Sequence, residues 1–100
     1  MINSDYDKFI NNLYYGDEFE ISYNGKQYFI QSYYKKDFHN IEVSQWKPLI
    51  ERVLWKSVSK EPQKNIDKFL KSNIFDCRAF IDIKPKVEWL DIGTIEIKYI

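Results

Sequence analysis

Two side chains in this sequence could support nucleophilic catalysis: a single histidine, His39, and a single cysteine, Cys77. A cysteine nucleophile needs a neighbouring base, and His39 is the only histidine that could serve. Cys77 lies between Asp76 and Arg78, and a nearby cation or helix N-terminus makes a thiol more reactive. No metal-binding histidine or cysteine motif is present. We therefore expect a loop histidine and a half-buried structural cysteine, with no catalytic residue and no metal site.

Acidic residues cluster at Asp17, Glu18 and Glu20. Paired carboxylates can bind cations or perform acid–base chemistry, but no third ligand follows at calcium-loop spacing. The three glycines form no phosphate-binding loop. We expect a solvated acidic face and no cofactor.

A second group of residues is typical of surfaces that bind single-stranded nucleic acid, where lysines lie among aromatic rings. Its members are Lys35, Lys36, Lys47, Tyr33, Tyr34 and Trp46. The chain as a whole has 15 basic and 15 acidic residues, and its isoelectric point is about 6.6. Nucleic-acid binders are usually basic, so nucleic acid is an unlikely partner by composition.

Charge is uneven along the chain. Residues 1–34 hold five acidic and two basic side chains, whereas residues 35–60 hold six basic and three acidic ones. This distribution fits either an ordinary solvated surface or a polar partner surface that is acidic at the first strand.

The strongest structural signal is Asn24-Gly25, because a two-residue type I′ turn needs φ > 0 at both positions. Alternating apolar residues flank it, which predicts a β-hairpin over residues 18–31. The predicted pairs are Tyr23 with Lys26, Ile21 with Tyr28, and Phe19 with Ile30. A slip of one residue would turn Phe19 and Ile21 to the opposite face, so burial and turn chemistry favour the same register.

The second face of this hairpin is the candidate partner surface. Phe29 and Tyr33 fall there among polar side chains, and exposed aromatic residues in a polar setting indicate a contact site. In the alternative, the C-terminal segment with Trp89 and Ile92 folds over them. The residues of the candidate surface are Glu18, Glu20, Phe29, Gln31 and Tyr33.

The remaining elements follow from periodicity. A helix is expected over residues 4–14, with Ser4 as N-cap and Gly16 as the stop. The second strand extends to Tyr34, a polar turn covers residues 35–40, and a third strand covers residues 41–46. Residues 49–58 fit either a helix or a fourth strand, and we favour the strand.

The most secure helix starts near Pro62, which suits an early helical position. Its apolar face comprises Ile66, Phe69, Leu70 and Ile74, and Ser72-Asn73 ends it. Asp76 is expected to cap a short helix that runs through Ile83 and stops before Pro85. Alternation over residues 94–99 predicts a final strand.

The hairpin, together with the run Ile74-Phe-Asp…Phe80…Glu88-Trp89, resembles a family of small, uncharacterised bacterial proteins. The resemblance spans roughly residues 9–91 and implies an α+β fold without known catalytic residues. The sequence departs from the family pattern at Cys77-Arg78, where glycine-lysine is usual, and at Lys84-Pro85-Lys86, where acidic helical residues are usual. The extension after Gly93 also looks additional.

We expect one α+β domain over residues 1–100: an N-terminal helix, an antiparallel meander of three or four strands, one central helix, and an irregular C-terminal segment ending in a strand. One cysteine allows no internal disulfide, and no signal peptide or membrane span is visible, so a cytoplasmic location is expected. The predicted function is a non-enzymatic protein–protein interaction module, with an immunity-type inhibitor of a bacterial toxin as one concrete form. A second copy of the chain is a further candidate partner. The alternative is a small regulatory nucleic-acid-binding protein, and an enzyme is the least favoured class.

Overall fold

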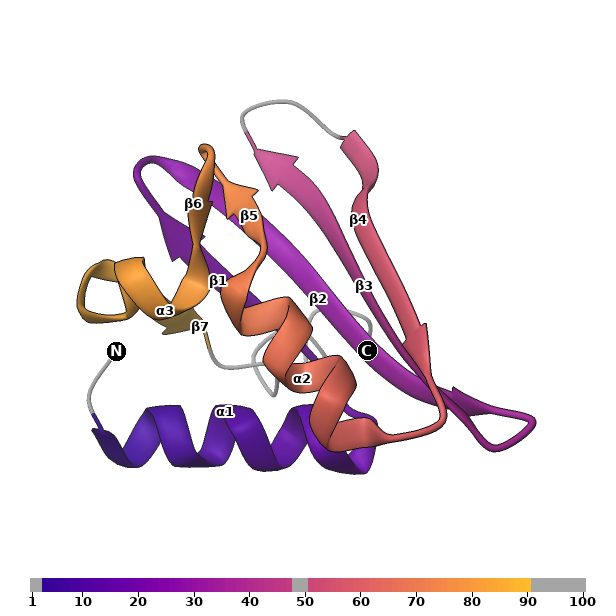
Figure 1. Cartoon of the computed structure of the whole chain (residues 1–100). Coiled ribbons are helices and arrows are strands. Elements are labelled where there is room, and N and C mark those ends of the chain that lie inside the picture. The colour runs from indigo at the N-terminus through magenta and orange to yellow at the C-terminus, as the bar shows by residue number, and fades with distance from the viewer. Residues whose placement is uncertain (1–2, 48–50, 91–100) are drawn as a thin grey trace, which may run out of the picture.

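The computed structural model describes residues 3–47 and 51–90 (Figure 1). Its elements, in chain order, are α1 (Asn3–Tyr15), β1 (Glu18–Tyr23), β2 (Lys26–Lys35), β3 (Phe38–Lys47), β4 (Glu51–Ser59), α2 (Pro62–Lys71), β5 (Asn73–Phe75), β6 (Arg78–Ala79), α3 (Phe80–Ile83), a 3₁₀ turn η1 (Lys84–Lys86) and β7 (Glu88–Leu90). The predicted α+β class and the order of its main elements are confirmed.

The main sheet is an antiparallel meander with one added strand. Its strand order is β4-β3-β2-β1-β7, so the four consecutive strands β1 to β4 are neighbours and β7 pairs with β1. The helices α1, α2 and α3 and the small β5–β6 hairpin all lie on one side of this sheet (Figure 1). The strand favoured over residues 49–58 is confirmed by β4.

The register of the first hairpin is the one that the turn chemistry predicts. Tyr23 pairs with Lys26, and the pairing continues to Glu18 opposite Gln31. Asn24 and Gly25 have φ values of 51° and 78°, as a type I′ turn requires. Alternate residues of β1 are buried, so one face of the hairpin is directed into the core.

The core fills the space between the sheet and the helices. Phe9 of α1 lies at its centre, stacked on Phe80 with ring centroids 4.6 Å apart and in edge contact with Phe19 at 4.6 Å. Phe69 of α2 contacts the same ring at 6.1 Å. Such aromatic pairs each add about 0.5–1.5 kcal/mol beyond the burial of their area. One side chain therefore joins α1, β1, α2 and α3.

The two long helices end where the sequence predicts. Gly16 has a φ of +87°, and its N–H donates to the carbonyl of Asn12 at 3.0 Å, as expected for a residue that stops a helix. Ser72 follows the last residue of α2. The start of α1 differs, because the helix already begins at Asn3 and Ser4 lies inside its first turn. Ile74 is not on the apolar face of α2 but in β5.

The polar turn expected over residues 35–40 is shorter than predicted. Only Lys36 and Asp37 form the loop, with φ values of 51° and 69°, and β3 starts at Phe38. Both loop residues adopt the left-handed backbone without a glycine, so the sequence carries a weak turn signal. As a result His39 belongs to a strand, and the prediction of a loop histidine is wrong.

Asp76 caps no helix. It forms the turn of the β5–β6 hairpin together with Cys77, and both have positive φ values. Its carboxylate accepts a hydrogen bond from Asn24 Nδ2 at 3.0 Å and pairs with the ammonium of Lys26. These bonds hold the pKa of Asp76 below its usual value. The tips of two distant hairpins are thus tied together. The strand predicted over residues 94–99 lies outside the described residues.

Candidate partner-binding surface on the open face of the sheet

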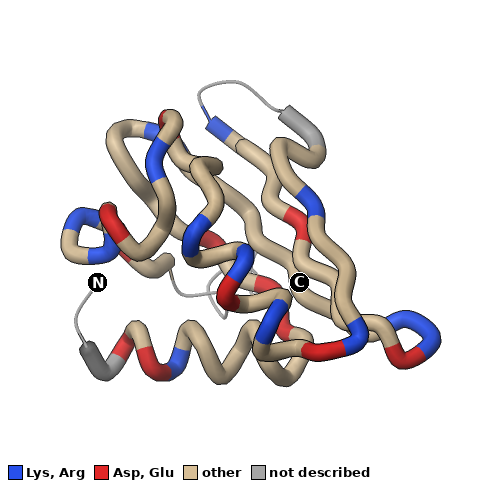
Figure 2. Tube along the Cα trace, viewed as in Figure 1, with Lys and Arg blue, Asp and Glu red and all other residues tan. Residues whose placement is uncertain are grey.

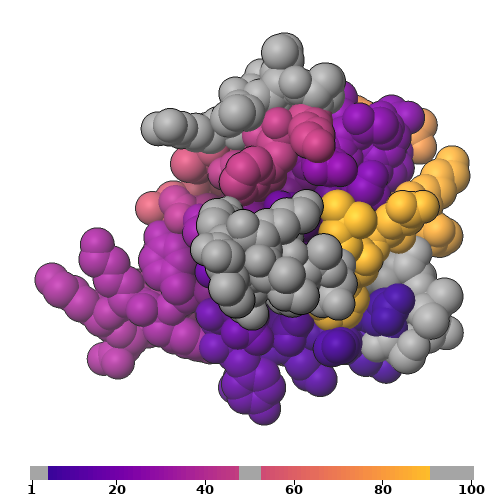
Figure 3. All heavy atoms as spheres, turned by 180° about the vertical axis from the view of Figure 1, so that it is seen from behind, coloured from indigo at the N-terminus to yellow at the C-terminus, as the bar shows by residue number. Residues whose placement is uncertain are grey.

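We call the side of the main sheet opposite the helices the open face; Figure 3 views the molecule from that side. Among the described residues, no helix packs against it (Figure 1). In β1 and β2, residues that are buried in the core alternate with residues that face the other side. The second group includes the five residues of the predicted surface: Glu18, Glu20, Phe29, Gln31 and Tyr33. The structure therefore brings the predicted surface residues together.

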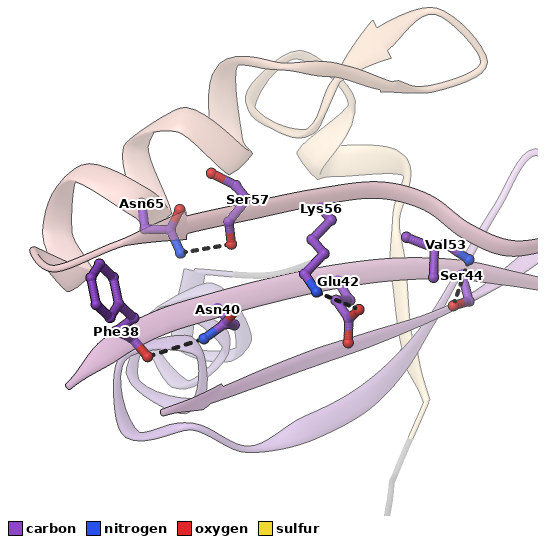
Figure 4. Close-up of polar contacts among 8 residues, drawn as sticks. All are labelled: Phe38, Asn40, Glu42, Ser44, Val53, Lys56, Ser57 and Asn65. Carbon is purple, nitrogen blue, oxygen red and sulfur yellow. Dashed lines mark hydrogen bonds and ion pairs between the residues drawn. The ribbon is translucent and has the colours of Figure 1, made fainter. Parts of the chain in front are cut away.

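A polar row crosses four strands at the middle of the open face. Glu18 pairs with Gln31, Gln31 with Glu42, and Glu42 with Lys56. Gln31 Nε2 donates to Glu18 Oε2 at 3.3 Å. The Lys56 ammonium lies 3.5 Å from a carboxylate oxygen of Glu42 (Figure 4). Sequence reasoning missed Glu42 and Lys56, because it assigned no register to β3 and β4.

Aromatic side chains lie on both sides of this row. Phe29 is half-buried and makes an edge contact with Trp46, whose ring centroid lies 5.6 Å away and whose side chain is 41% exposed. Tyr33 is also half-buried and pairs across the sheet with Asn40. Phe29 and Tyr33 are thus neither fully exposed nor withdrawn into the core. The open face offers flat aromatic area interrupted by a polar row.

The open face has an acidic side and a basic side. Glu18 and Glu20 lie on β1, and Glu88 of β7 extends the acidic side because it pairs with Ser22. Lys47 and Lys56 lie on β3 and β4. Part of the charge difference between residues 1–34 and 35–60, carried by Glu18 and Glu20 against Lys47 and Lys56, therefore becomes a difference between the two sides of one surface.

The strained backbone of β4 lies at one end of this surface. Val53 has a φ of +51°, which is rare for a β-branched residue. Its N–H donates to the hydroxyl of Ser44 at 3.3 Å, across a break in the β3–β4 register (Figure 4). The Val53 side chain is exposed at this irregularity.

His39 is fully buried, and both its ring nitrogens are engaged. Nε2 lies 2.7 Å from the carbonyl oxygen of Leu13, which can only accept, so Nε2 carries the proton. Nδ1 lies 2.9 Å from the amide nitrogen of Asn65 and accepts from it. The imidazole therefore joins α1, β3 and α2. Its role is structural.

Asn65 completes this buried polar network. Its amide nitrogen also donates to the carbonyl oxygen of His39 at 2.9 Å. It donates to the carbonyl oxygen of Ser57 at 3.3 Å as well (Figure 4). Ser57 Oγ and Asn65 Oδ1 are buried without a hydrogen-bond partner. Serine, histidine and asparagine meet here, but the serine hydroxyl does not bond the imidazole. A nucleophile–base pair requires that bond.

Cys77 lies elsewhere, exposed in the β5–β6 turn. The prediction of a half-buried structural cysteine is therefore wrong. Because His39 is enclosed and its nitrogens are occupied, the only cysteine and the only histidine do not form a nucleophile–base pair.

The residues grouped by sequence as a basic–aromatic surface are divided in space. Tyr33, Trp46 and Lys47 belong to the open face. Tyr34 lies on the other side of β2, where its ring faces His39 at 5.1 Å. Lys35 and Lys36 lie at the tip of the β2–β3 hairpin.

A groove of about 500 Å³ lies between α1 and α2, away from the open face. Tyr6 lines it, and the pKa of its hydroxyl is raised by partial burial and by the carboxylates of Asp67 and Asp7. Its lining combines apolar side chains such as Ile10 and Ile66 with polar ones such as Asn11 and Gln63.

Within residues 3–47 and 51–90, no group of three or more histidine, cysteine, aspartate or glutamate side chains could hold a metal ion. None of the described helices is long and apolar enough to cross a membrane. No family model matches the sequence, and the comparisons with curated proteins and with solved structures return no match. The likeness to a family of small bacterial proteins therefore stays a resemblance.

Proposed function

We propose that this protein is a non-enzymatic binding module whose open face docks a partner protein. The observation that carries the proposal is the composition of that face: Phe29, Tyr33 and Trp46 lie around a polar row on a sheet surface that no described helix covers. Tyrosine, tryptophan and phenylalanine are enriched at protein interfaces. The arrangement of His39 and Cys77 also favours binding over catalysis.

The charges of the open face favour a partner with a basic surface. Glu18, Glu20 and Glu88 form its acidic side, and opposite potentials steer association and exclude wrong partners. An immunity-type inhibitor is a concrete form of this proposal. Enzymes that act on nucleic acid carry basic surfaces, and an acidic module covering such a surface would block it.

Differential capture tests the proposal. Wild-type protein and the double variant Glu20→Arg/Gln31→Arg, both purified, are crosslinked in an extract of the source organism, and the captured proteins are identified by mass spectrometry. The double variant cancels the net negative charge of the acidic side without removing an aromatic residue. A protein captured only by the wild type is then purified and titrated by calorimetry. We expect its dissociation constant to rise at least tenfold with the variant.

The matched control is Asp67→Arg/Gln63→Arg on α2. Gln63 Nε2 donates to Asp67 Oδ1 at 3.2 Å, and both residues are exposed on the helical side. Replacing one acidic residue and one glutamine with arginine changes the charge by the same amount as in the test variant. The control should bind as the wild type does. A partner that loses affinity for the control and keeps it for Glu20→Arg/Gln31→Arg would contradict the proposed surface. If the captured protein is toxic on expression, coexpressed wild type should restore growth and Glu20→Arg/Gln31→Arg should not.

A further inference from the structure

A second surface lies at the end of the molecule where α1 finishes and the β2–β3 hairpin turns. Four of the large hydrophobic side chains that remain exposed gather there: Tyr14 at 45%, Tyr15 at 74%, Tyr34 at 46% and Phe38 at 38%. We call this group, with the lysines described next, the tyrosine–lysine end. It is distinct from the open face, because its tyrosines come from α1 and from the core-facing side of β2.

Direct contacts join the three tyrosines of this group. The Tyr34 hydroxyl donates to the carbonyl of Tyr14 at 2.6 Å. The rings of Tyr14 and Tyr15 are in edge contact, with centroids 5.5 Å apart. Phe38 pairs with Lys35 across the hairpin, next to the Tyr34–His39 pair. The three tyrosines are thus joined by direct contacts, and Tyr15 contributes the most accessible ring.

Three lysines lie at this end of the molecule. Lys35 and Lys36 lie at the hairpin tip, and the Lys60 ammonium lies 5.5 Å from the centroid of the Phe38 ring. Figure 2 shows a basic segment followed by an acidic one at the hairpin tip, and in the sequence these are Lys35-Lys36 and Asp37. The neutral charge of the whole chain therefore hides a local excess of positive charge beside exposed aromatic faces.

We propose that the tyrosine–lysine end binds single-stranded nucleic acid, with bases stacked on Tyr15 and its neighbours and phosphates paired with Lys35, Lys36 and Lys60. Stacking on aromatic rings next to a basic track is the chemistry that binds single strands without sequence preference. The C-terminus of α1 carries partial negative charge, so the phosphates lie on the side of the β2–β3 turn. This site is separate from the proposed partner surface.

The proposal predicts a salt dependence. Two to three phosphate contacts give a slope of log affinity against log salt of about −1.4 to −2.1 for single strands. Affinity for a fluorescein-labelled 12-nucleotide oligothymidine should then fall about 7- to 18-fold between 50 and 200 mM salt, as measured by fluorescence anisotropy. Lys35→Ala/Lys36→Ala should reduce this loss to about threefold, because one lysine contact remains.

Two further variants separate stacking from charge. Tyr15→Ala should weaken binding at least fivefold at 50 mM salt while leaving the salt slope unchanged. Lys68→Ala/Lys71→Ala removes the same charge as the hairpin variant from the far end of α2, and should bind as the wild type does. Far-UV circular dichroism and the thermal midpoint of each variant show that its fold is retained.

Four results would overturn the proposal. The first is that the 12-nucleotide oligothymidine does not bind at 50 mM salt and 100 µM protein. Equal losses for the hairpin variant and the Lys68→Ala/Lys71→Ala control would show that binding is diffuse. A duplex of the same length that binds as tightly as the single strand would exclude base stacking. Cosedimentation with phosphatidylserine vesicles that depends on Tyr15, without oligonucleotide binding, would assign the site to a membrane surface instead.

Discussion

Replacing Asn65 with alanine should remove a large part of the stability of the fold. Asn65 is 1% exposed, and its amide nitrogen serves three buried acceptors: the imidazole and carbonyl of His39 and the carbonyl of Ser57. The amide has two hydrogens, so truncation loses about two hydrogen bonds and leaves buried acceptors unsatisfied, at about 1–3 kcal/mol each. The Asn65 Oδ1 atom has no partner, and its removal offsets part of the loss. We expect a net cost of about 2–4 kcal/mol.

Urea unfolding followed by tryptophan fluorescence measures this cost. The chain has three tryptophans, and Trp55 and Trp89 pack against the core, so their emission should report the loss of packing. A small domain has a slope of about 1–3 kcal/mol per molar urea, so a loss of 3 kcal/mol lowers the midpoint by about 1–3 M. An unchanged slope would show that the variant unfolds from the same native state.

The companion variant is Ser57→Ala. Ser57 is buried to a similar extent, but its hydroxyl has no hydrogen-bond partner. Removing it should change the free energy of unfolding by less than about 1 kcal/mol, or increase it, because an unsatisfied buried polar atom disappears. A cost below 1 kcal/mol for Asn65→Ala, or equal costs for the two variants, would refute this account of the network.

Three further changes have expected signs. Val53→Gly should stabilise the fold by about 0.5–1 kcal/mol, because it removes the strain of a β-branched residue at positive φ. Val58→Gly, at a position in β4 with regular backbone, should destabilise the fold by about 1 kcal/mol. The urea midpoint measures both changes. Lys26→Met should cost at most about 1 kcal/mol at pH 7, because the pair with Asp76 is partly exposed. The folded pKa of Asp76 is depressed, so its contribution is present above the unfolded pKa near 3.9, and the difference between Lys26→Met and the wild type should vanish as the pH falls to 2–3. Burial, then Asp76 and a neighbouring tyrosine, raise the pKa of Tyr28 to about 12, so stability should fall between pH 10 and 12, and Tyr28→Phe should flatten that decline.

The sequence predicts those parts of the fold whose signals are local. Asn24-Gly25 determines the turn, and alternation on both sides determines which side chains are buried, so the register of β1 and β2 and the grouping of Phe29, Gln31 and Tyr33 follow. Gly16 predicts the end of α1, because it adopts the positive φ that stops a helix. Pro62 predicts the start of α2, because its fixed φ suits the first helical position.

The errors share a physical cause. The turns at Lys36-Asp37 and at Asp76-Cys77 adopt positive φ without glycine, which costs energy that only the surrounding pairing repays. Local propensity therefore gives no warning that the first turn has only two residues or that the second exists. The first turn was predicted too long, which placed His39 in a loop, and the second was not predicted, which made Asp76 a helix cap. Strand alternation also divides the basic–aromatic group, because the neighbouring residues Tyr33 and Tyr34 lie on opposite sides of the sheet.

The pairing of β7 with β1 has a consequence for the order of folding. Contacts among β1, β2, β3 and β4 join neighbouring segments, whereas Ile21 meets Trp89 across most of the chain. Pairings close in sequence lose less entropy and form first. During synthesis the meander and α2 can therefore assemble while the outer edge of β1 still lacks its neighbour. An unpaired strand edge invites association with other chains, so the outer edge of β1 is covered only once the three residues of β7 have been made and paired with it.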